Sequence, residues 1–228
     1  MPKTIGVLGG MGPESTAIFY RQIILECQKQ YGAQYDEDYP EMLIYNLPIP
    51  DVVEGLKDQS KTLAMLVEGS RKLESIGVDF LVMPCGSAHY FYGDVKKQLS
   101  IPFLSIVKET AKKVKSRGHT KVGLLATKTT IDHGVYNAEL NGQGIEVIAP
   151  REQDKLTEII LNILAGKKLG SDKQELLRII STLKSNGAQA IILGCTDLPA
   201  LLDDKDVDLE LFDATKILAE ATVKYAMA

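Results

Sequence analysis

One short unit occurs twice in this chain, and each copy ends in a cysteine. In the first copy a polar stretch closes with a glycine, and the apolar run 80–83 then leads to Cys85. In the second copy the same order of features leads through the apolar run 190–193 to Cys195. A glycine after a polar stretch is typical of a helix end, and a short apolar run bounded by Gly or Pro predicts a buried strand. We therefore expect two half-molecules that each offer one thiol to a shared cleft.

Alternating strands and helices are expected in both halves. The expected strands cover residues 4–8, 42–45, 80–83, 102–106, 121–126, 146–150, 190–193 and 210–213. The expected helices cover residues 14–31, 60–76, 88–99, 107–117, 132–140, 153–164, 171–186 and 214–227. Such alternation predicts parallel sheets covered by helices. The fold class expected is therefore α/β, with two similar lobes, residues 1–106 and 107–212, each a parallel four-stranded sheet flanked by helices, and a cleft between them.

Composition limits the class of protein. With 45% hydrophobic and 25% charged residues, this chain of 228 residues has the balance of a globular protein that can bury a core. The formal net charge of −4 and the lack of a basic run argue against nucleic acid or an anionic membrane as the main partner. No apolar run reaches the ~18 residues of a membrane span, and the first strand follows Lys3 directly. We therefore expect no signal peptide and a cytoplasmic location.

The cysteines show no sign of a disulfide framework or a metal site. There are three, with no CxxC motif and no Cys/His spacing of the kind that holds zinc. This pattern predicts reduced thiols, and no metal is expected. Cys27 lies in the first helix on an apolar stripe with Ala17, Tyr20, Ile23 and Ile24, which predicts an inert core residue.

The loop at residues 9–13 invites comparison with dinucleotide-binding loops. Its Gly-Met-Gly matches the first half of GxGxxG, but Ser15 stands at the third glycine position and a proline lies inside the motif. We therefore do not expect a nucleotide. Two interpretations stay open: backbone N–H groups that approach a small anion at a helix N-terminus, or a tight strand-to-helix turn. In the second half the matching loop, residues 127–130, carries hydroxyl groups in place of glycines.

The carboxyl ends of the expected strands should carry the function. In a parallel sheet these ends share one edge, where α/β proteins bind ligands. Within each half, the loop after the first strand and the cysteine turn therefore fall on the same edge. A further loop at this edge, residues 46–51, begins with Asn46 and is stiffened by two prolines.

Two opposed thiols can perform one kind of chemistry without a cofactor. A helix N-terminus stabilises a thiolate, but two nearby thiols do not both ionise because the anions repel. The expected resting state is one thiolate and one thiol. Such a pair can remove a proton from one face of a carbon and deliver another to the opposite face, which inverts a stereocentre without a cofactor.

Other interpretations of these residues stay open. His89 lies one helical turn beyond Cys85 and is a possible base for it, which would make a one-thiol lyase or hydrolase of small carboxylic acids. His133 follows the hydroxyl loop, and both histidines also fit plain surface or capping roles. A protein that binds an acidic amino acid without turning it over is the third possibility.

The chain resembles the cofactor-independent aspartate/glutamate racemase family, most closely its aspartate racemase branch. The matching stretches are residues 5–13, 83–85, 88–89, 123–127 and 194–196. The resemblance implies that Cys85 and Cys195 are the catalytic acid/base residues in the cleft, and that the substrate is L- and D-aspartate or possibly glutamate. It also implies homodimers, a last helix (residues 213–228) that packs back on the first lobe, and no metal, pyridoxal phosphate or nucleotide.

The resemblance also suggests which residues bind the substrate, and it exposes departures among them. The expected substrate-binding residues are Gly10, Met11, Asn46, Gly86, Ser87, Ala88, Thr127, Thr130 and Thr196. Gly86 stands where the family usually has asparagine, Val52 where some aspartate racemases have a carboxylate-binding arginine, and Leu164 where some have lysine. A dicarboxylate needs charge-complementary donors. The sequence therefore predicts intact proton-transfer groups beside an altered substrate clamp.

Overall fold

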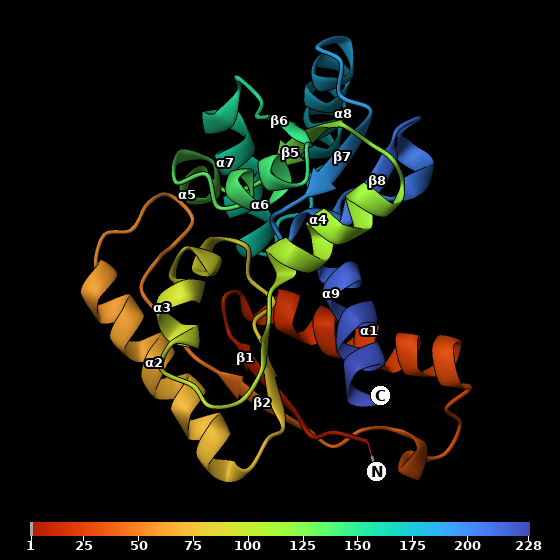
Figure 1. The fold of residues 1–228 in the computed structure, drawn as a ribbon. Helices are drawn as coiled ribbons and strands as arrows, with labels where there is room; N and C mark the ends of the chain where they lie inside the picture. The colour runs from red at the N-terminus through yellow and green to blue at the C-terminus, as the bar shows by residue number, and fades with distance from the viewer. Residues whose placement is uncertain (1) are drawn as a thin grey trace.

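A computed structural model describes residues 2–228, which form two parallel four-stranded sheets (Figure 1). The first sheet has the order β2-β1-β3-β4, with β1 at Ile5–Gly9, β2 at Met42–Asn46, β3 at Phe80–Val82 and β4 at Phe103–Leu104. The second has the order β6-β5-β7-β8, with β5 at Lys121–Leu125, β6 at Glu146–Ile148, β7 at Ala190–Leu193 and β8 at Glu210–Asp213. Every strand pair is parallel, which confirms the predicted α/β class with two similar sheets.

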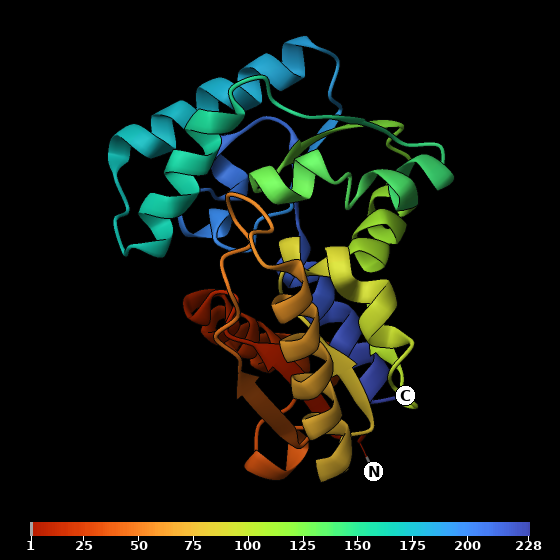
Figure 2. The same ribbon diagram turned by 90° about the vertical axis from the view of Figure 1, so that its left-hand side faces the viewer.

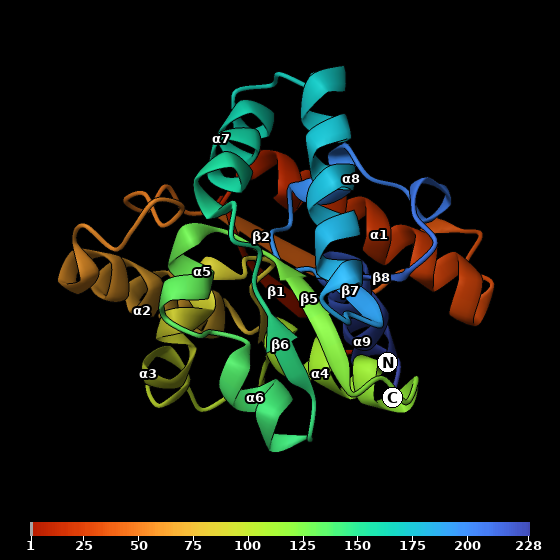
Figure 3. The ribbon, with the colours of Figure 1, turned by 90° about the horizontal axis from the view of Figure 1, so that it is seen from above.

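Helices cover both faces of both sheets (Figures 1 and 3). They are α1 (Pro13–Tyr31), α2 (Gln59–Ile76), α3 (Tyr92–Lys96), α4 (Ile106–Ser116), α5 (Lys128–Asp132), α6 (Asn137–Gly142), α7 (Gln153–Leu164), α8 (Gly170–Ser185) and α9 (Ala214–Ala226). The 3₁₀ turns are η1 (Asp36–Asp38), η2 (Ser87–Phe91), η3 (Leu198–Ala200) and η4 (Asp204–Asp206). Within residues 2–228, no helix is both long and apolar enough to cross a lipid bilayer.

One apolar core joins the two sheets. It contains buried residues of β1 and β3, of β5, β7 and β8, and of the helices α1, α4 and α9. α9 follows the last strand of the second sheet but packs against α1 and α4 (Figure 1). A second core lies under α2 and a third under α7 and α8. The shared core holds the carboxyl ends of β3 and β7 close together.

The repeated glycine stops have the backbone that the sequence predicts. Gly77 follows α2 with φ of 100°, and Gly187 follows α8 with φ of 93°. This left-handed conformation is strained for any residue with a Cβ, so glycine ends each helix and turns the chain into the cysteine strand.

Three expectations about helices are wrong. Residues 88–99 form η2 and the short α3 instead of one helix, because the His89 ring bonds back to the carbonyl of Cys85. Residues 132–140 are divided between α5 and α6, since Gly134 has φ of 57° and breaks the helix. Residues 127–130 are not a loop: Thr127 caps α5, and its side chain accepts a hydrogen bond from the Thr130 backbone N–H.

The apolar stripe of the first helix is only partly as predicted. Ile23 and Cys27 are fully buried, but Ala17 is exposed, and 42% of Tyr20 is exposed. Phe19 takes the buried place beside Ile23. Burial raises the pKa of Cys27 to about 11, which fits an inert core thiol.

Candidate active site

Cys85 and Cys195 face the same small cavity between the two sheets. Each thiol residue is 5% exposed, and the cavity measures about 140 Å³. Its lining residues are Gly10, Met11, Gly12, Ile49, Pro50, Asp51, Val52, Val53, Cys85, Gly86, Ser87, Thr127, Leu164, Cys195, Thr196 and Asp197. This volume is below the ~300–1,000 Å³ of pockets for drug-sized ligands. The cavity therefore suits a small metabolite.

The two cysteine turns touch each other. A Cβ placed on Gly86 would overlap the carbonyl oxygen of Gly194, and only a glycine permits this approach. The Gly194 turn is held in turn by the carbonyl of Leu125, which accepts hydrogen bonds from the backbone N–H groups of Gly194 (2.8 Å) and Cys195 (3.2 Å). The absence of a side chain at position 86 thus lets the two cysteine turns come into contact.

Hydroxyl groups from both halves form a buried network at the cavity. Ser87 Oγ lies 2.7 Å from Thr127 Oγ1, which lies 2.9 Å from Thr130 Oγ1. Ser87 belongs to the turn after β3, and both threonines belong to the start of α5. Because a hydroxyl can donate or accept, this network can adapt to a bound carboxylate.

The structure places most of the predicted binding residues at the cavity, but not all of them. Gly10, Met11, Gly86, Ser87, Thr127 and Thr196 line it. Thr130 lies behind Thr127, and Ala88 is buried in the apolar core under α2. Asn46 is exposed at the end of β2, outside the lining.

A loop from the first half crosses to the second and closes one side of the cavity. Residues 49–53 line the cavity, and the Val53 carbonyl accepts a hydrogen bond of 3.3 Å from the backbone N–H of Thr129 in α5. Figure 2 shows this loop rising from the lower sheet to the upper helices. The loop brings Val52 into the lining, where it is almost fully buried.

Asp197 is a site residue that our sequence prediction missed. The Cys195 thiol donates to Asp197 Oδ2 at 3.6 Å, and the Ser15 hydroxyl donates to Asp197 Oδ1 at 2.5 Å. The available signal was a carboxylate two residues after a strand-end cysteine. The sequence did not show the importance of Asp197, because its hydrogen-bond partner Ser15 is distant in sequence.

Burial and local charge set the pKa values of the two thiols. Burial raises the pKa of Cys85 to about 12, and the charge of Asp197 adds to this rise, whereas the backbone N–H groups of Ala88 and Ser87 oppose it. Burial also raises the pKa of Cys195 well above its usual value, and the carboxylate of Asp197 raises it further. Burial raises the pKa of Asp197, whereas the Ser15 and Cys195 hydrogen bonds lower it. Burial and the charge of Asp197 thus act on both thiols in the same direction, and the direct hydrogen bond to Asp197 distinguishes Cys195.

His89 cannot serve as a base for Cys85 in this fold. Its Nδ1 lies 2.7 Å from the Cys85 carbonyl oxygen, and its Nε2 accepts a hydrogen bond of 3.2 Å from the Ile106 backbone N–H. Both ring nitrogens are occupied, and burial lowers the pKa of His89 to about 4. His133 is exposed on the surface and packs against Tyr90. The interpretation as a one-thiol enzyme with His89 as base is thus wrong.

The cavity lining carries acidic but no basic side chains. Among the described residues that line it there is no lysine or arginine, whereas Asp51 and Asp197 supply carboxylates. The three departures noted in the sequence, Val52, Gly86 and Leu164, all belong to the lining. The nearby Lys168 is paired with Glu14 at 2.9 Å.

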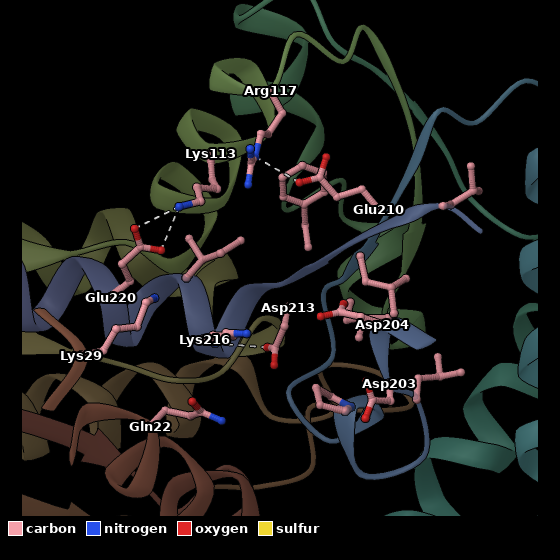
Figure 4. Close-up of a pocket in the computed structure, with 17 residues that line it drawn as sticks. Gln22, Lys29, Lys113, Arg117, Asp203, Asp204, Glu210, Asp213, Lys216 and Glu220 are labelled. Atoms are coloured by element: carbon pink, nitrogen blue, oxygen red, sulfur yellow. Dashed lines mark hydrogen bonds and ion pairs between the residues drawn. The ribbon is translucent and has the colours of Figure 1, made fainter. Parts of the chain in front are cut away.

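A larger cavity, about 580 Å³, lies elsewhere, between α1, α4, α9 and β8 (Figure 4). Ion pairs join Lys113 to Glu220 at 2.9 Å and Arg117 to Glu210 at 3.1 Å along its wall. It contains neither cysteine, so we assign the chemistry to the smaller cavity. Across residues 2–228, no three His, Cys, Asp or Glu side chains gather as metal ligands would.

Comparison with known proteins places the chain in a family. The family model described as Asp/Glu/hydantoin racemase matches residues 8–222. The chain is 37% identical over 227 residues to the broad specificity amino-acid racemase RacX of Bacillus subtilis (strain 168), covering 98% of both chains.

Two solved structures are similar over nearly the whole chain. An aspartate racemase homologue from Pyrococcus horikoshii OT3 has a TM-score of 0.84 and 31% identity, covering 99% of this chain and 100% of that one. The aspartate racemase of Picrophilus torridus has a TM-score of 0.83 and 28% identity, covering 99% and 94%. With its two matched sheets and its paired strand-end cysteines, the chain belongs to the Asp/Glu/hydantoin racemase family.

Proposed function

We propose that this protein is an amino-acid racemase that uses Cys85 and Cys195 as a pair of acid/base residues. The observation that carries the proposal is the shared cavity, which both thiols line from different sheets. Family membership makes an isomerase the expected class of enzyme. Two-base racemisation needs two proton-transfer groups on opposite sides of one carbon, and each cysteine turn supplies one.

The proposed reaction has two proton transfers. One cysteine, as thiolate, takes the α-proton, and the electron pair of the C–H bond moves into the substrate carboxylate. The other cysteine, as thiol, then gives its proton to the opposite face of the same carbon. The enzyme is left with the protonation states exchanged, so it is ready for the reverse reaction. Backbone N–H groups at the Gly86 turn and hydroxyls of Ser87 and Thr127 are placed to bind the carboxylate as charge builds up on it.

We propose that the preferred substrate has a neutral side chain. A side-chain carboxylate of aspartate or glutamate would meet no arginine or lysine in the described lining, but the carboxylates of Asp51 and Asp197. Burying such a charge without a partner is costly. Ile49, Val52, Val53 and Leu164 instead offer an apolar wall. Aspartate, the substrate expected from the family resemblance, is therefore the compound to compare against.

The test is proton NMR of single enantiomers in D2O with the reduced protein. Alanine, serine and leucine would be compared with aspartate and glutamate, starting from the L and from the D form. Loss of the α-proton signal, with chiral analysis showing the opposite enantiomer, would support racemisation. Faster turnover of aspartate than of every neutral amino acid would overturn the substrate assignment. Thermal stabilisation by an amino acid without any exchange would favour a binding protein and overturn the racemase.

We also propose that the reaction needs no pyridoxal phosphate or metal, because the two thiols account for both proton transfers. Activity should then survive dialysis against hydroxylamine and against EDTA. A homodimer and a cytoplasmic location remain predictions from the sequence. Light scattering on the purified chain tests the dimer.

A further inference from the structure

A chain of hydrogen bonds connects the first half of the molecule to the Cys195 thiol. Ser15, in the first turn of α1, donates to Asp197 Oδ1, and Asp197 Oδ2 accepts the Cys195 S–H at 3.6 Å. Ser15 is completely buried, and Asp197 and Cys195 are nearly so. Each oxygen of the carboxylate therefore has one donor, and the two donors come from opposite sides of the cavity.

The hydrogen bond from Ser15 is the main interaction that holds the Asp197 carboxylate in place. The Ser15 donor lies in the first turn of α1, a helix of 19 residues, and the N-terminal end of a helix favours a nearby negative charge. The charge of Glu14 opposes ionisation of Asp197, and Glu14 is itself paired with Lys168. With no lysine or arginine among the described lining residues, the Ser15 hydroxyl is the donor that orients the carboxylate.

Cys85 has a different environment. Burial and the charge of Asp197 raise the pKa of its thiol, whereas the backbone N–H groups of Ala88 and Ser87 act in the opposite direction. No carboxylate hydrogen bond of the kind Cys195 makes is present at Cys85 in the described structure. The pair is therefore asymmetric in one respect: within the described structure, Cys195 donates its S–H to a carboxylate and Cys85 does not.

We propose that Ser15 is a positioning residue that holds Asp197 against the Cys195 thiol, so that Cys195 rests as the protonated member of the pair. The catalytic part of this inference rests on the proposed racemase function. Because Ser15 and Asp197 belong to different halves, the hydrogen bond forms only when the two halves have the separation seen here.

The test is the rate of alkylation of each cysteine by iodoacetamide over a series of pH values, resolved by peptide mass spectrometry. In the unaltered protein Cys85 should react faster than Cys195. Ser15→Ala should speed alkylation of Cys195 about tenfold at a given pH, as a one-unit fall in the pKa of its thiol would. The rate for Cys85 should not change. Asp197→Asn should also speed alkylation of Cys195, with a smaller rise at Cys85 because the Asp197 charge acts on that thiol too. Adding Ser15→Ala to Asp197→Asn should bring no further change at Cys195.

One control variant and the comparison between the two cysteines make the outcome decisive. Ser70→Ala removes another fully buried hydroxyl, one without a hydrogen-bond partner in the described structure, and should alter neither cysteine. If Ser15→Ala speeds both cysteines equally, it merely loosens the fold and the proposal is overturned. Unchanged rates at Cys195 would also overturn it.

The catalytic readout separates this inference from the proposed function. In a racemase, Ser15→Ala should lower kcat about tenfold with little change in KM, since it alters a proton-transfer group and not a substrate contact. If no racemisation is found in the unaltered protein, the proposed function fails. The alkylation rates still decide whether Ser15 acts on Cys195.

Discussion

Gly86 and Gly194 bring the two cysteine turns into direct backbone contact. Gly86 has no room for a Cβ, because the carbonyl oxygen of Gly194 occupies that space. The sequence showed Gly86 only as a departure from the asparagine usual in the family. In the structure it is the position that lets the two halves approach.

Gly86→Ala should therefore disturb the contact between the two cysteine turns. Forcing a methyl group against a fixed carbonyl costs ~1–3 kcal/mol in a packed interior, so we expect this loss of unfolding free energy in urea denaturation. Racemisation should fall because the thiols are pushed apart. Gly93→Ala is the matched control, as a Cβ there meets nothing within 4 Å. Equal stability of the two variants would contradict the close contact.

Cys85→Ser and Cys195→Ser should each abolish measurable racemisation. Positioned acid/base groups contribute ~10²–10⁴-fold, and a serine hydroxyl is a far weaker acid than a thiol. Chiral chromatography of the product gives the measurement. Cys27→Ser provides the control, because this buried residue of α1 lies outside the cavity and should affect stability alone. Full activity without Cys195 would disprove the two-base mechanism.

Val52→Arg should shift selectivity toward aspartate. The side chain at position 52 lines the cavity, and a guanidinium there can pair with a side-chain carboxylate through two hydrogen bonds. We expect the ratio of kcat/KM for aspartate to that for alanine to rise at least about tenfold, which corresponds to ~1.4 kcal/mol. Ile76→Arg, on the exposed end of α2, adds the same charge at a distance. An equal shift in both variants would show a general charge effect.

His89 should make the fold sensitive to acid. Burial lowers its pKa to about 4, against an ordinary value of about 6.5, so the unfolded chain takes up this proton first as pH falls. Stability linked to His89 is thus present above about pH 6.5 and is lost down to about pH 4, by roughly 3 kcal/mol. Urea denaturation across this range, compared with His89→Gln, gives the measurement. An equal slope in both proteins would contradict a buried neutral His89.

The sequence by itself predicted the strands of both sheets and the position of Cys85 and Cys195 just after two strand ends. Short apolar runs specify strands, and glycines such as Gly77 specify helix ends, because these signals are local. The helix boundaries near His89 and Gly134 were wrong, since a side-chain hydrogen bond and a left-handed glycine overrode the local pattern.

Only the tertiary structure decided how the residues of the site meet. The hydrogen bond between Ser15 and Asp197 joins residues 182 positions apart, and no local pattern encodes such a pair. The same holds for His89, whose two ring nitrogens are occupied by groups that the sequence does not place beside it. Local propensities act along the chain, whereas protonation and orientation in the cavity depend on groups that packing brings together from both halves.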